Sequence, residues 1–300
     1  MNAVQRAAVD NPVARASVEP VTVVYVAYGV TTLDVSWLDA DDAVIVVHND
    51  DLLPLGSIEH GRGVDLVSRG NVGFGAAVNA ALDLVATDRV ILCNPDTQLT
   101  REHRQLLGSA GPDELVTVAL DDDLGEPTWV VLPYPGALAA VAMGYRLGRV
   151  LGRRSRLRAL AARLLTVRRP RYASLLGVDS GSWPLTTHWV SAAVLSTATE
   201  RIRAVGGFDA GFFLYMEDVN LCQRLAVRFP SMRVRVAKST PGRHAVGGSI
   251  SARRRPAVEL ERILSLRRYC SLQPGLGWRA ARAALRPRAW WLTIRAGETR

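Results

Sequence analysis

Two acidic residues, Glu217 and Asp218, stand between an aromatic stretch and a helical pattern in GGFDAGFFLYMEDVNLCQRL (residues 206–225). The spacing of the apolar residues after them predicts a helix with both carboxylates in its first turn. Acids at that position complement the helix dipole, and this alone can explain them. The preceding glycines and phenylalanines also predict an aromatic-walled approach, in which an ionised carboxylate acts as a general base toward a hydroxyl group.

A further acid, Asp96, ends the apolar segment DRVILCNPD (residues 88–96) beside a turn-forming proline. A carboxylate at the end of a buried strand can hold a divalent cation whose open positions take diphosphate oxygens. A strand-terminating Asx turn is the alternative, and for an isolated motif it is the commoner case. His244 lies in PGRHAVGGS (residues 241–249), which we expect to be a loop. It is a candidate metal ligand or phosphate donor, and an exposed loop histidine is the alternative.

The elements that must position these residues read as alternating strands and helices. Apolar, β-branched runs predict strands over residues 21–29, 41–50, 63–70 and 88–96, and helical spacing covers residues 76–86. Residues 187–209 read as strand, helix and turn, and residues 232–239 as a half-buried strand. This alternation predicts an α/β fold with a mostly parallel sheet and helices on both faces. Ligands of such sheets bind beyond the carboxyl ends of the strands, where the polar turns 48–50, 71–75 and 94–96 fall.

Charge is distributed unevenly along the chain. The formal net charge is +9, and residues 127–178 alone contain ten arginines and no acid. Within residues 144–165 the spacing predicts a helix with an apolar stripe on one side and arginines on the other. This pattern is typical of a helix lying in an anionic interface. A surface helix with solvated arginines is the alternative. Residues 262–300 are also rich in arginine and carry Trp278, Trp290 and Trp291 as candidate interface anchors.

Several classes of protein fit the sequence poorly. Lys238 is the only lysine, which disfavours a P-loop or Schiff-base site, and no GxGxxG fingerprint follows a strand. The three cysteines are widely spaced, which argues against a disulfide framework or zinc site and fits a reducing compartment. Residues 1–20 lack the apolar core of a signal peptide, and no apolar run reaches the roughly 18 residues of a spanning helix.

The motifs VTVVYVAYG, NVGFGAAVN, CNPDTQL, WVSAAVL, GGFDAGFFLYMEDVNLCQRL and HAVGGS occur in an order that resembles the inverting family 2 glycosyltransferases. The resemblance covers roughly residues 21–250. Within that family the sequence looks most like bacterial rhamnosyltransferases that build cell-wall and O-antigen polysaccharides. The resemblance implies a GT-A fold, a Rossmann-like, mostly parallel sheet with helices on both faces. To this fold the charge pattern adds a basic helical insert and a C-terminal helical segment.

The resemblance also implies roles for the matched positions. Asp218 matches the base that deprotonates the acceptor hydroxyl, with Glu217 beside it as the second catalytic residue. Asp96 and His244 match ligands of a divalent metal, Mg²⁺ or Mn²⁺. The expected donor-binding residues are Tyr28, Asn49, Arg69, Asn71, Gly73, Asn79, Asn94 and Asp96. The expected acceptor-binding residues are Trp189, Ser191 and Phe213.

Three positions depart from the pattern of the family. His48 stands where an aspartate is usual, and Gly29 where an asparagine is usual, both near the nucleotide base. Their presence leaves the identity of the donor open. Ala192 replaces a glycine and is expected to tighten the acceptor pocket.

The expected organisation and function follow from the resemblance. The ranges are a flexible tail (1–20), the nucleotide-sugar-binding half of a GT-A domain (21–126), an arginine-rich helical insert (127–178), the acceptor and catalytic half (179–250) and a basic C-terminal helical segment (251–300). The expected activity is transfer of a sugar, foremost L-rhamnose from dTDP-L-rhamnose, to a polyprenyl-diphosphate-linked or other cell-envelope glycan. UDP-sugars and other dTDP-sugars stay open as donors.

The expected location is cytoplasmic, peripheral at the inner face of the cell membrane, with the anionic membrane surface as a partner. Two alternatives remain from other classes. An arginine-rich nucleic-acid-binding protein would explain the charge, although no zinc, helix-turn-helix or RNP-type signature accompanies it. A catalytically silent nucleotide-sugar-binding protein would explain the departures at Gly29 and His48.

Overall fold

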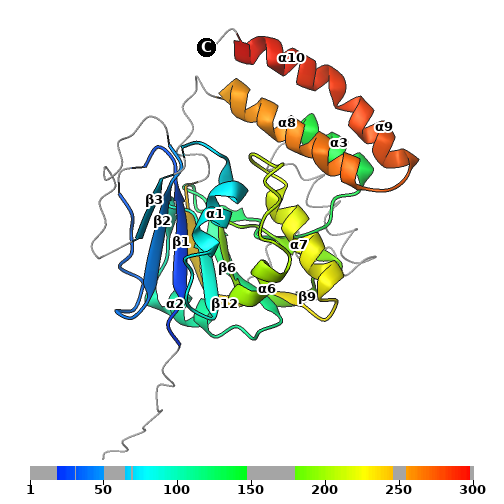
Figure 1. Cartoon of the computed structure of the whole chain (residues 1–300). Helices are drawn as coiled ribbons and strands as arrows, with labels where there is room; N and C mark the ends of the chain where they lie inside the picture. The colour runs from blue at the N-terminus through cyan, green and yellow to red at the C-terminus, as the bar shows by residue number, and fades with distance from the viewer. Residues whose placement is uncertain are drawn as a thin grey trace, which may run out of the picture.

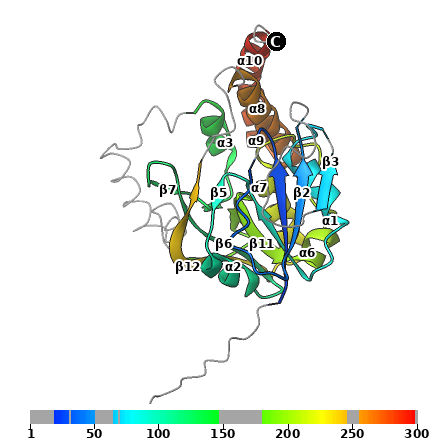
Figure 2. The same ribbon diagram turned by 90° about the vertical axis from the view of Figure 1, so that its left-hand side faces the viewer.

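The computed structural model describes residues 19–30, 32–50, 65–68, 70–146, 180–245 and 255–297. Within these ranges the chain forms a mixed, mostly parallel sheet that is flanked by helices, with a layer of C-terminal helices at one end (Figure 1). A view turned by 90° shows the same C-terminal helices rising above the sheet (Figure 2). The predicted α/β architecture with a C-terminal helical segment is therefore confirmed.

The strands are buried, β-branched runs wherever they lie at the centre of the sheet. Their bounds are β1 Thr22–Ala27, β2 Ala43–His48, β3 Asp65–Ser68, β4 Arg89–Cys93, β5 Thr97–Gln98, β6 Glu114–Asp121, β7 Pro127–Thr128, β8 Val131–Pro133, β9 Gly181–Pro184, β10 His188–Val190, β11 Val194–Ala198 and β12 Arg233–His244.

The described part of the sheet has the order β3-β2-β1-β4-β11-β6-β12-β5, with β7 paired to β6 and β9 to β12. The pairs β3–β2, β2–β1, β1–β4 and β6–β12 are parallel. β11 lies antiparallel between β4 and β6. The strands β8 and β10 form a separate antiparallel pair. Residues from both sides of the arginine-rich stretch therefore contribute to one sheet.

The helices are α1 Phe74–Leu82, α2 Arg101–Gly108, α3 Ala137–Gly144, α6 Thr199–Ala204, α7 Glu217–Arg228, α8 Arg255–Leu272, α9 Leu276–Ala284 and α10 Arg286–Gly297. α1 packs against β1 and β2, and α2 packs against β6, β11 and β12. α8, α9 and α10 pack on one another and on α3. Among the described helices, none is both long and apolar enough to cross a bilayer.

Two groups of buried apolar side chains stabilise the chain. The larger lies between the sheet and its helices. The smaller joins the C-terminal helices to the segment before α7, and includes Phe212, Met216, Ile263, Tyr269 and Leu285. Because Trp189 and Tyr134 pack against both groups, they connect the sheet to the helical layer.

One element differs from the sequence-based expectation. Residues 241–249 were expected to form a loop, but β12 continues to His244. The register shifts between Ala237 and Gly242, after which β12 pairs with β5 as well as β6. A bulge accommodates Pro241, which has no N–H to donate, so the strand resumes beyond it. Residues 1–18 of the predicted tail (1–20), residues 147–178 of the predicted arginine-rich insert (127–178), and residues 179 and 246–254 lie outside the described ranges.

Candidate active site

The predicted site residues gather at one end of the sheet. Tyr28, Asn49 and Asn94 each follow the carboxyl end of a parallel strand, β1, β2 and β4 respectively. β12 ends at His244 and runs parallel to β6. β11 is antiparallel to β4, so its first residue, Val194, pairs with the last residue of β4 at this same end. Sheet topology therefore brings together residues that are more than 200 positions apart in sequence, such as Tyr28 and His244.

Asn94, Asp96 and His244 form a contact cluster at this end. His244 Nε2 lies 3.2 Å from Asp96 Oδ1 and 3.2 Å from Asn94 Nδ2. The pairing of His244 with Thr97 between β12 and β5 fixes the two segments side by side. The Ala245 N–H also donates to the Asp96 carbonyl at 3.1 Å. The extension of β12 to His244 is thus what places the histidine on the Asn94-Pro95-Asp96 turn.

The carboxylate and imidazole of this cluster are of the types that ligate divalent metals. The side chains of Asp96 and His244 are 19% and 14% exposed, so both can reach a ligand. Mg²⁺ is usually held by one or two protein carboxylates together with substrate phosphates, not by a full protein cage. The described residues include no group of three or more His, Cys, Asp or Glu side chains able to hold a metal.

Asp218 has the environment of a general base. Its carboxylate accepts the N–H of Val219 at 2.8 Å and a hydrogen bond from the backbone of Ala192. Burial raises the pKa of Asp218 to about 6, although these backbone donors oppose the increase. A carboxyl group with this pKa is ionised at neutral pH and is more basic than an exposed aspartate.

Glu217 is the more deeply buried partner of the pair. It is 6% exposed, and its Oε2 is buried with no hydrogen-bond partner. Burial, followed by the neighbouring Asp218 carboxylate, raises the pKa of Glu217 well above its usual range. Burial therefore favours the protonated form of Glu217.

The turn that leads into α7 has an unusual backbone. Tyr215 and Met216 both have positive φ, 69° and 67°, and neither is a glycine. Non-glycine residues in this region cost on the order of 1–3 kcal/mol each and often occur at functional sites. The two residues lead directly into the first turn of α7, which contains Glu217 and Asp218. The sequence gives no signal for this, because tyrosine and methionine do not mark left-handed turns.

A two-residue bridge connects the acidic turn to Asp218. The Asn94 N–H donates to the Ala193 carbonyl at 2.8 Å, while the backbone of Ala192 bonds to the carboxylate of Asp218. Since adjacent Cα atoms are about 3.8 Å apart, the Asn94 backbone and the Asp218 carboxylate are on the order of 10 Å apart. Sequence reasoning noticed Ala192 only as a departure, and missed its contact with Asp218.

The loop before α1 touches the aromatic segment before α7. Gly73 has φ 88°, and a Cβ atom there would lie 2.4 Å from the Phe213 carbonyl oxygen. That carbonyl accepts the Phe74 N–H at 3.0 Å. Gly73 thus permits a close backbone approach. Asn71, two residues earlier, is exposed at the same end of the sheet.

Asn49 and Asp50 organise the ends of β1 and β2. The Asn49 Oδ1 accepts the Val72 N–H at 2.9 Å, and the Asp50 Oδ2 accepts the Gly29 N–H at 2.6 Å. Gly29 has φ 65°, a conformation that glycine and asparagine both adopt. This shared backbone conformation explains why glycine can stand at position 29, where the family usually has asparagine. His48 is 3% exposed, and its Nε2 is buried without a hydrogen-bond partner.

Asn79 braces the segment that leads to α7. Its Nδ2 donates to the Phe208 carbonyl at 2.8 Å, and its Oδ1 accepts the Phe208 N–H at 2.7 Å. The Asn79 side chain thus binds both backbone groups of Phe208 and fixes the position of the segment that leads to α7. A role of Asn79 in donor binding stays a prediction. Arg69 lies outside the described residues.

The three predicted acceptor residues lie in segments that adjoin the Ala192–Ala193 bridge, α7 and Gly73. Trp189 on β10 is half-buried, and its Nε1 is buried without a hydrogen-bond partner. Ser191 accepts the Ala193 N–H at 3.3 Å, so it shapes the bridge described above. Phe213 is half-buried beside Gly73. The structure brings these residues to the site, and their contact with an acceptor stays a prediction.

α8 makes direct contacts with the segment before α7, residues 206–216. The buried Ser265 Oγ donates to the Leu214 carbonyl at 2.8 Å. The Arg268 Nη2 donates to both carboxylate oxygens of Asp209 at 2.9 Å, and its guanidinium lies 5.2 Å from the centre of the Phe212 ring. The C-terminal helices thus position the residues before Asp218. Sequence spacing did not reveal this contact, because it joins positions about 50 residues apart.

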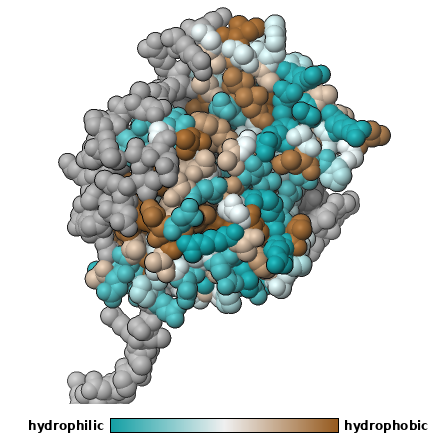
Figure 3. Space-filling model, in the orientation of Figure 1, coloured by the Kyte–Doolittle hydropathy of each residue, from teal (hydrophilic) through white to brown (hydrophobic). Residues whose placement is uncertain are grey.

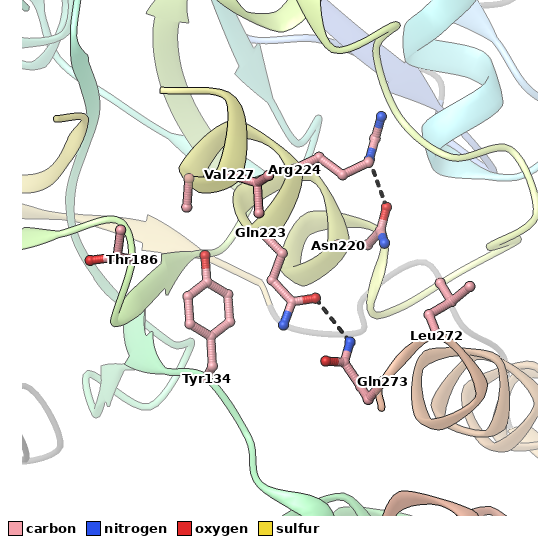
Figure 4. Close-up of a pocket in the computed structure, with 9 residues that line it drawn as sticks. Tyr134, Thr186, Asn220, Gln223, Arg224, Val227, Leu272 and Gln273 are labelled. Atoms are coloured by element: carbon pink, nitrogen blue, oxygen red, sulfur yellow. Dashed lines mark hydrogen bonds between the residues drawn. The ribbon is translucent and has the colours of Figure 1, made fainter. Parts of the chain in front are cut away.

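A cavity of about 600 Å³ lies next to α7, but it is not the site of Asp218. Asn220 and Gln223 line it from the face of α7 opposite to Asp218. Gln273 Nε2 donates to Gln223 Oε1 at 3.1 Å, and Tyr134 forms another wall (Figure 4). The cavity therefore borders α8 and not the acidic turn.

Comparison with known proteins gives likenesses of fold only. No model of a known protein family and no curated protein matches the sequence. A crystal structure of TarS 1–349 from S. aureus is similar at 12% identity and a TM-score of 0.46, covering 82% of this chain and 66% of that one. The mannosyltransferase PcManGT from Pyrobaculum calidifontis, in complex with GDP-Man and Mn²⁺, is similar at 13% identity and a TM-score of 0.47, covering 93% and 73%. A mycobacterial protein is similar at 16% identity and a TM-score of 0.42, covering 85% and 76%.

Proposed function

We propose that the chain is an inverting, metal-dependent glycosyltransferase that moves a sugar from a nucleotide-sugar to a cell-envelope glycan. Inversion is a single displacement at the anomeric carbon. It requires a base on one side of that carbon and stabilisation of the departing diphosphate on the other. The site contains one candidate for each task.

Asp218 is the proposed base. Its carboxylate is half-buried, ionised at neutral pH and held by two backbone donors. In this role it takes the proton of the acceptor hydroxyl as the oxygen attacks the sugar. Burial favours the protonated form of Glu217, so we assign the role of base to Asp218 alone.

Asp96 and His244 are the proposed ligands of a divalent metal, with Asn94 beside them. Such a metal supplies positive charge to the oxygens of the leaving diphosphate. The residues themselves orient the diphosphate end of the donor toward the sheet. Asn71, Gly73 and Asn49 shape the neighbouring loop, which we assign to the nucleotide.

The observation that carries the proposal is the bridge of Ala192 and Ala193. Through it the acidic turn after β4 and the carboxylate of Asp218 are held on one edge of the sheet, roughly 10 Å apart. A single displacement needs the donor site and the acceptor base at one end of the sheet, and this connection supports that arrangement. A strand-terminating turn or a helix-capping acid alone would not require the other group to be near.

For the donor we propose dTDP-L-rhamnose, and for the acceptor a polyprenyl-diphosphate-linked glycan. The support is the resemblance of the ordered motifs to bacterial rhamnosyltransferases. The buried His48 at the end of β2 stands where the family usually has an acid, so the nucleotide base of the donor stays open. UDP-galactofuranose and UDP-hexoses are therefore included in the test.

The test is a thermal-shift screen of nucleotide-sugars with Mg²⁺ or Mn²⁺, followed by mass spectrometry of transfer products. We expect dTDP-L-rhamnose to raise the unfolding temperature only when metal is present. Binding without hydrolysis or transfer would identify the catalytically silent alternative. Stabilisation by nucleic acid but by no nucleotide-sugar would contradict the proposal and favour the nucleic-acid-binding alternative.

A further inference from the structure

The two last helices present a continuous outer surface. On the inner side of α9 and α10, Ala281, Leu285, Ala289 and Leu292 are buried in a stripe with helical spacing. Residues on the opposite side are exposed throughout both helices. In Figure 1 these helices lie at the top of the view, at the opposite end of the molecule from α2.

This outer surface carries large apolar side chains. Leu276 is 79% exposed, Trp290 68%, Ile294 44% and Trp291 43%. The space-filling view shows hydrophobic patches among hydrophilic ones over this end of the molecule (Figure 3). Trp278, by contrast, is half-buried and packs edge-to-face on Tyr269. The tryptophans of this stretch are therefore divided between the core and the surface.

The same surface is strongly basic. Residues 273–297 contain five arginines and no acid. Helical spacing on α10 places Trp290 and Ile294 between Arg286 on one side and Arg295 on the other. The Arg295 guanidinium lies 4.7 Å from the centre of the Trp291 ring. Apolar side chains flanked by arginines are the pattern of helices that lie in a membrane interface.

We propose that this outer face of α9 and α10, defined by Leu276, Arg286, Trp290, Trp291, Ile294 and Arg295, docks on an anionic lipid bilayer. The arginines meet phosphate-bearing headgroups, and tryptophan side chains occupy the headgroup region where aromatic rings are favoured. A nucleic acid would satisfy the arginines, but it offers nothing to Ile294 and Leu276. Charge and apolar exposure together thus favour lipid.

The docked orientation also concerns the active site. α8 packs against α9 and α10, and its Ser265 and Arg268 hold the segment that leads to Asp218. Docking would therefore place the acceptor side of the site close to the bilayer. This last step rests on the proposed function, whereas lipid binding itself does not.

The experiment measures vesicle binding by the full chain, without donor or acceptor. We expect co-sedimentation with phosphatidylcholine vesicles that contain phosphatidylglycerol, and little with phosphatidylcholine alone. The Trp290→Ser, Trp291→Ser double variant should bind roughly tenfold more weakly. The Arg286→Gln, Arg295→Gln variant should also bind more weakly and show a smaller dependence on salt.

The matched control is Arg101→Gln with Arg228→Gln, which removes the same charge from exposed positions on α2 and α7. Leu124→Ser, at a position that is 81% exposed, controls for apolar surface. Both controls should bind as the wild type does. Equal loss in the control and the α9–α10 variants would overturn the proposal, as would absence of vesicle binding or selective binding to duplex DNA. If the tryptophan variant does not fold, the arginine pair and its control decide the result.

Discussion

Gly73 approaches Phe213 so closely that the carbonyl oxygen of Phe213 occupies part of the space a side chain at Gly73 would need. The contact ties the loop before α1 to the segment before α7, which are about 140 residues apart. Gly73→Ala should therefore displace the approach to Asp218. We expect a loss of about 2–3 kcal/mol in the free energy of unfolding and a large loss of transfer.

The matched control for this variant is Gly125→Ala. Gly125 also has positive φ, 72°, but nothing lies within 4 Å of a Cβ there. It should cost only about 1 kcal/mol, the penalty of the backbone conformation. Denaturant unfolding of both variants measures the difference. Equal destabilisation would show that the contact with Phe213 does not matter.

Asp218→Asn separates catalysis from stability. It should remove most transfer while leaving donor binding nearly intact, because the base acts on the acceptor. The folded protein should also become more stable at neutral pH, by about 2 kcal/mol, since a buried ionised carboxylate is removed. Calorimetry and donor titration check both effects, with the exposed Asp41→Asn as control. Ordinary turnover would contradict the assignment of the base.

The pH dependence follows from the same group. Because the pKa of Asp218 is raised to about 6, kcat/KM should fall about tenfold per unit below that pH. The folded state binds this proton more tightly than the unfolded chain, in which the pKa is about 3.9. Its contribution to stability is therefore present below about pH 4 and lost as the pH rises through 6. A Tm difference between Asp218→Asn and wild type that does not grow over this range would refute the explanation.

Asp96→Asn should act on the donor side of the reaction. We expect the affinity for the nucleotide-sugar to fall about tenfold in the presence of metal and to become nearly independent of metal. His244→Ala should produce a smaller change in the same direction. The control is Asp88→Asn, which lies just before the other end of β4 and is exposed. Isothermal titration with and without EDTA measures both. Unchanged metal dependence in Asp96→Asn would exclude it as a ligand.

Ser265→Ala tests the contact between α8 and the segment before α7. Loss of its hydrogen bond to Leu214 should destabilise the protein by about 1–2 kcal/mol and lower kcat more than donor affinity. Ser271→Ala is the matched control, because Ser271 is an exposed serine of the same helix that bonds only within it. Parallel effects of the two variants on kcat would argue against a role in positioning.

The sequence predicted the central part of the fold well. The runs that became β1, β2 and β4 and the helix α1 are nearly continuous in apolar pattern, so local composition identifies them. The end of β12 was missed because Pro241 and Gly242 read as a loop, while pairing with β5 maintains the strand. Local pattern does not contain that long-range pairing.

The site divides in the same way. Asp96, Asp218 and His244 were identifiable because acids and a histidine adjoin turns or a helix start. The contacts that position them were not, since the backbone of Ala192, the left-handed Tyr215 and Met216 and the buried Ser265 carry no distinctive residue pattern. They depend on tertiary packing.

The position of β11 between β4 and β6 determines when the sheet can be completed during synthesis. β4 and β6 are both synthesised well before β11, yet they become neighbours of the same strand only when residues 194–198 arrive. Until the ribosome has released that segment, a nascent chain exposes an unpaired edge of β4, which can pair with other chains. We therefore expect chaperones to bind the chain during synthesis, and fragments that end before residue 194 to aggregate.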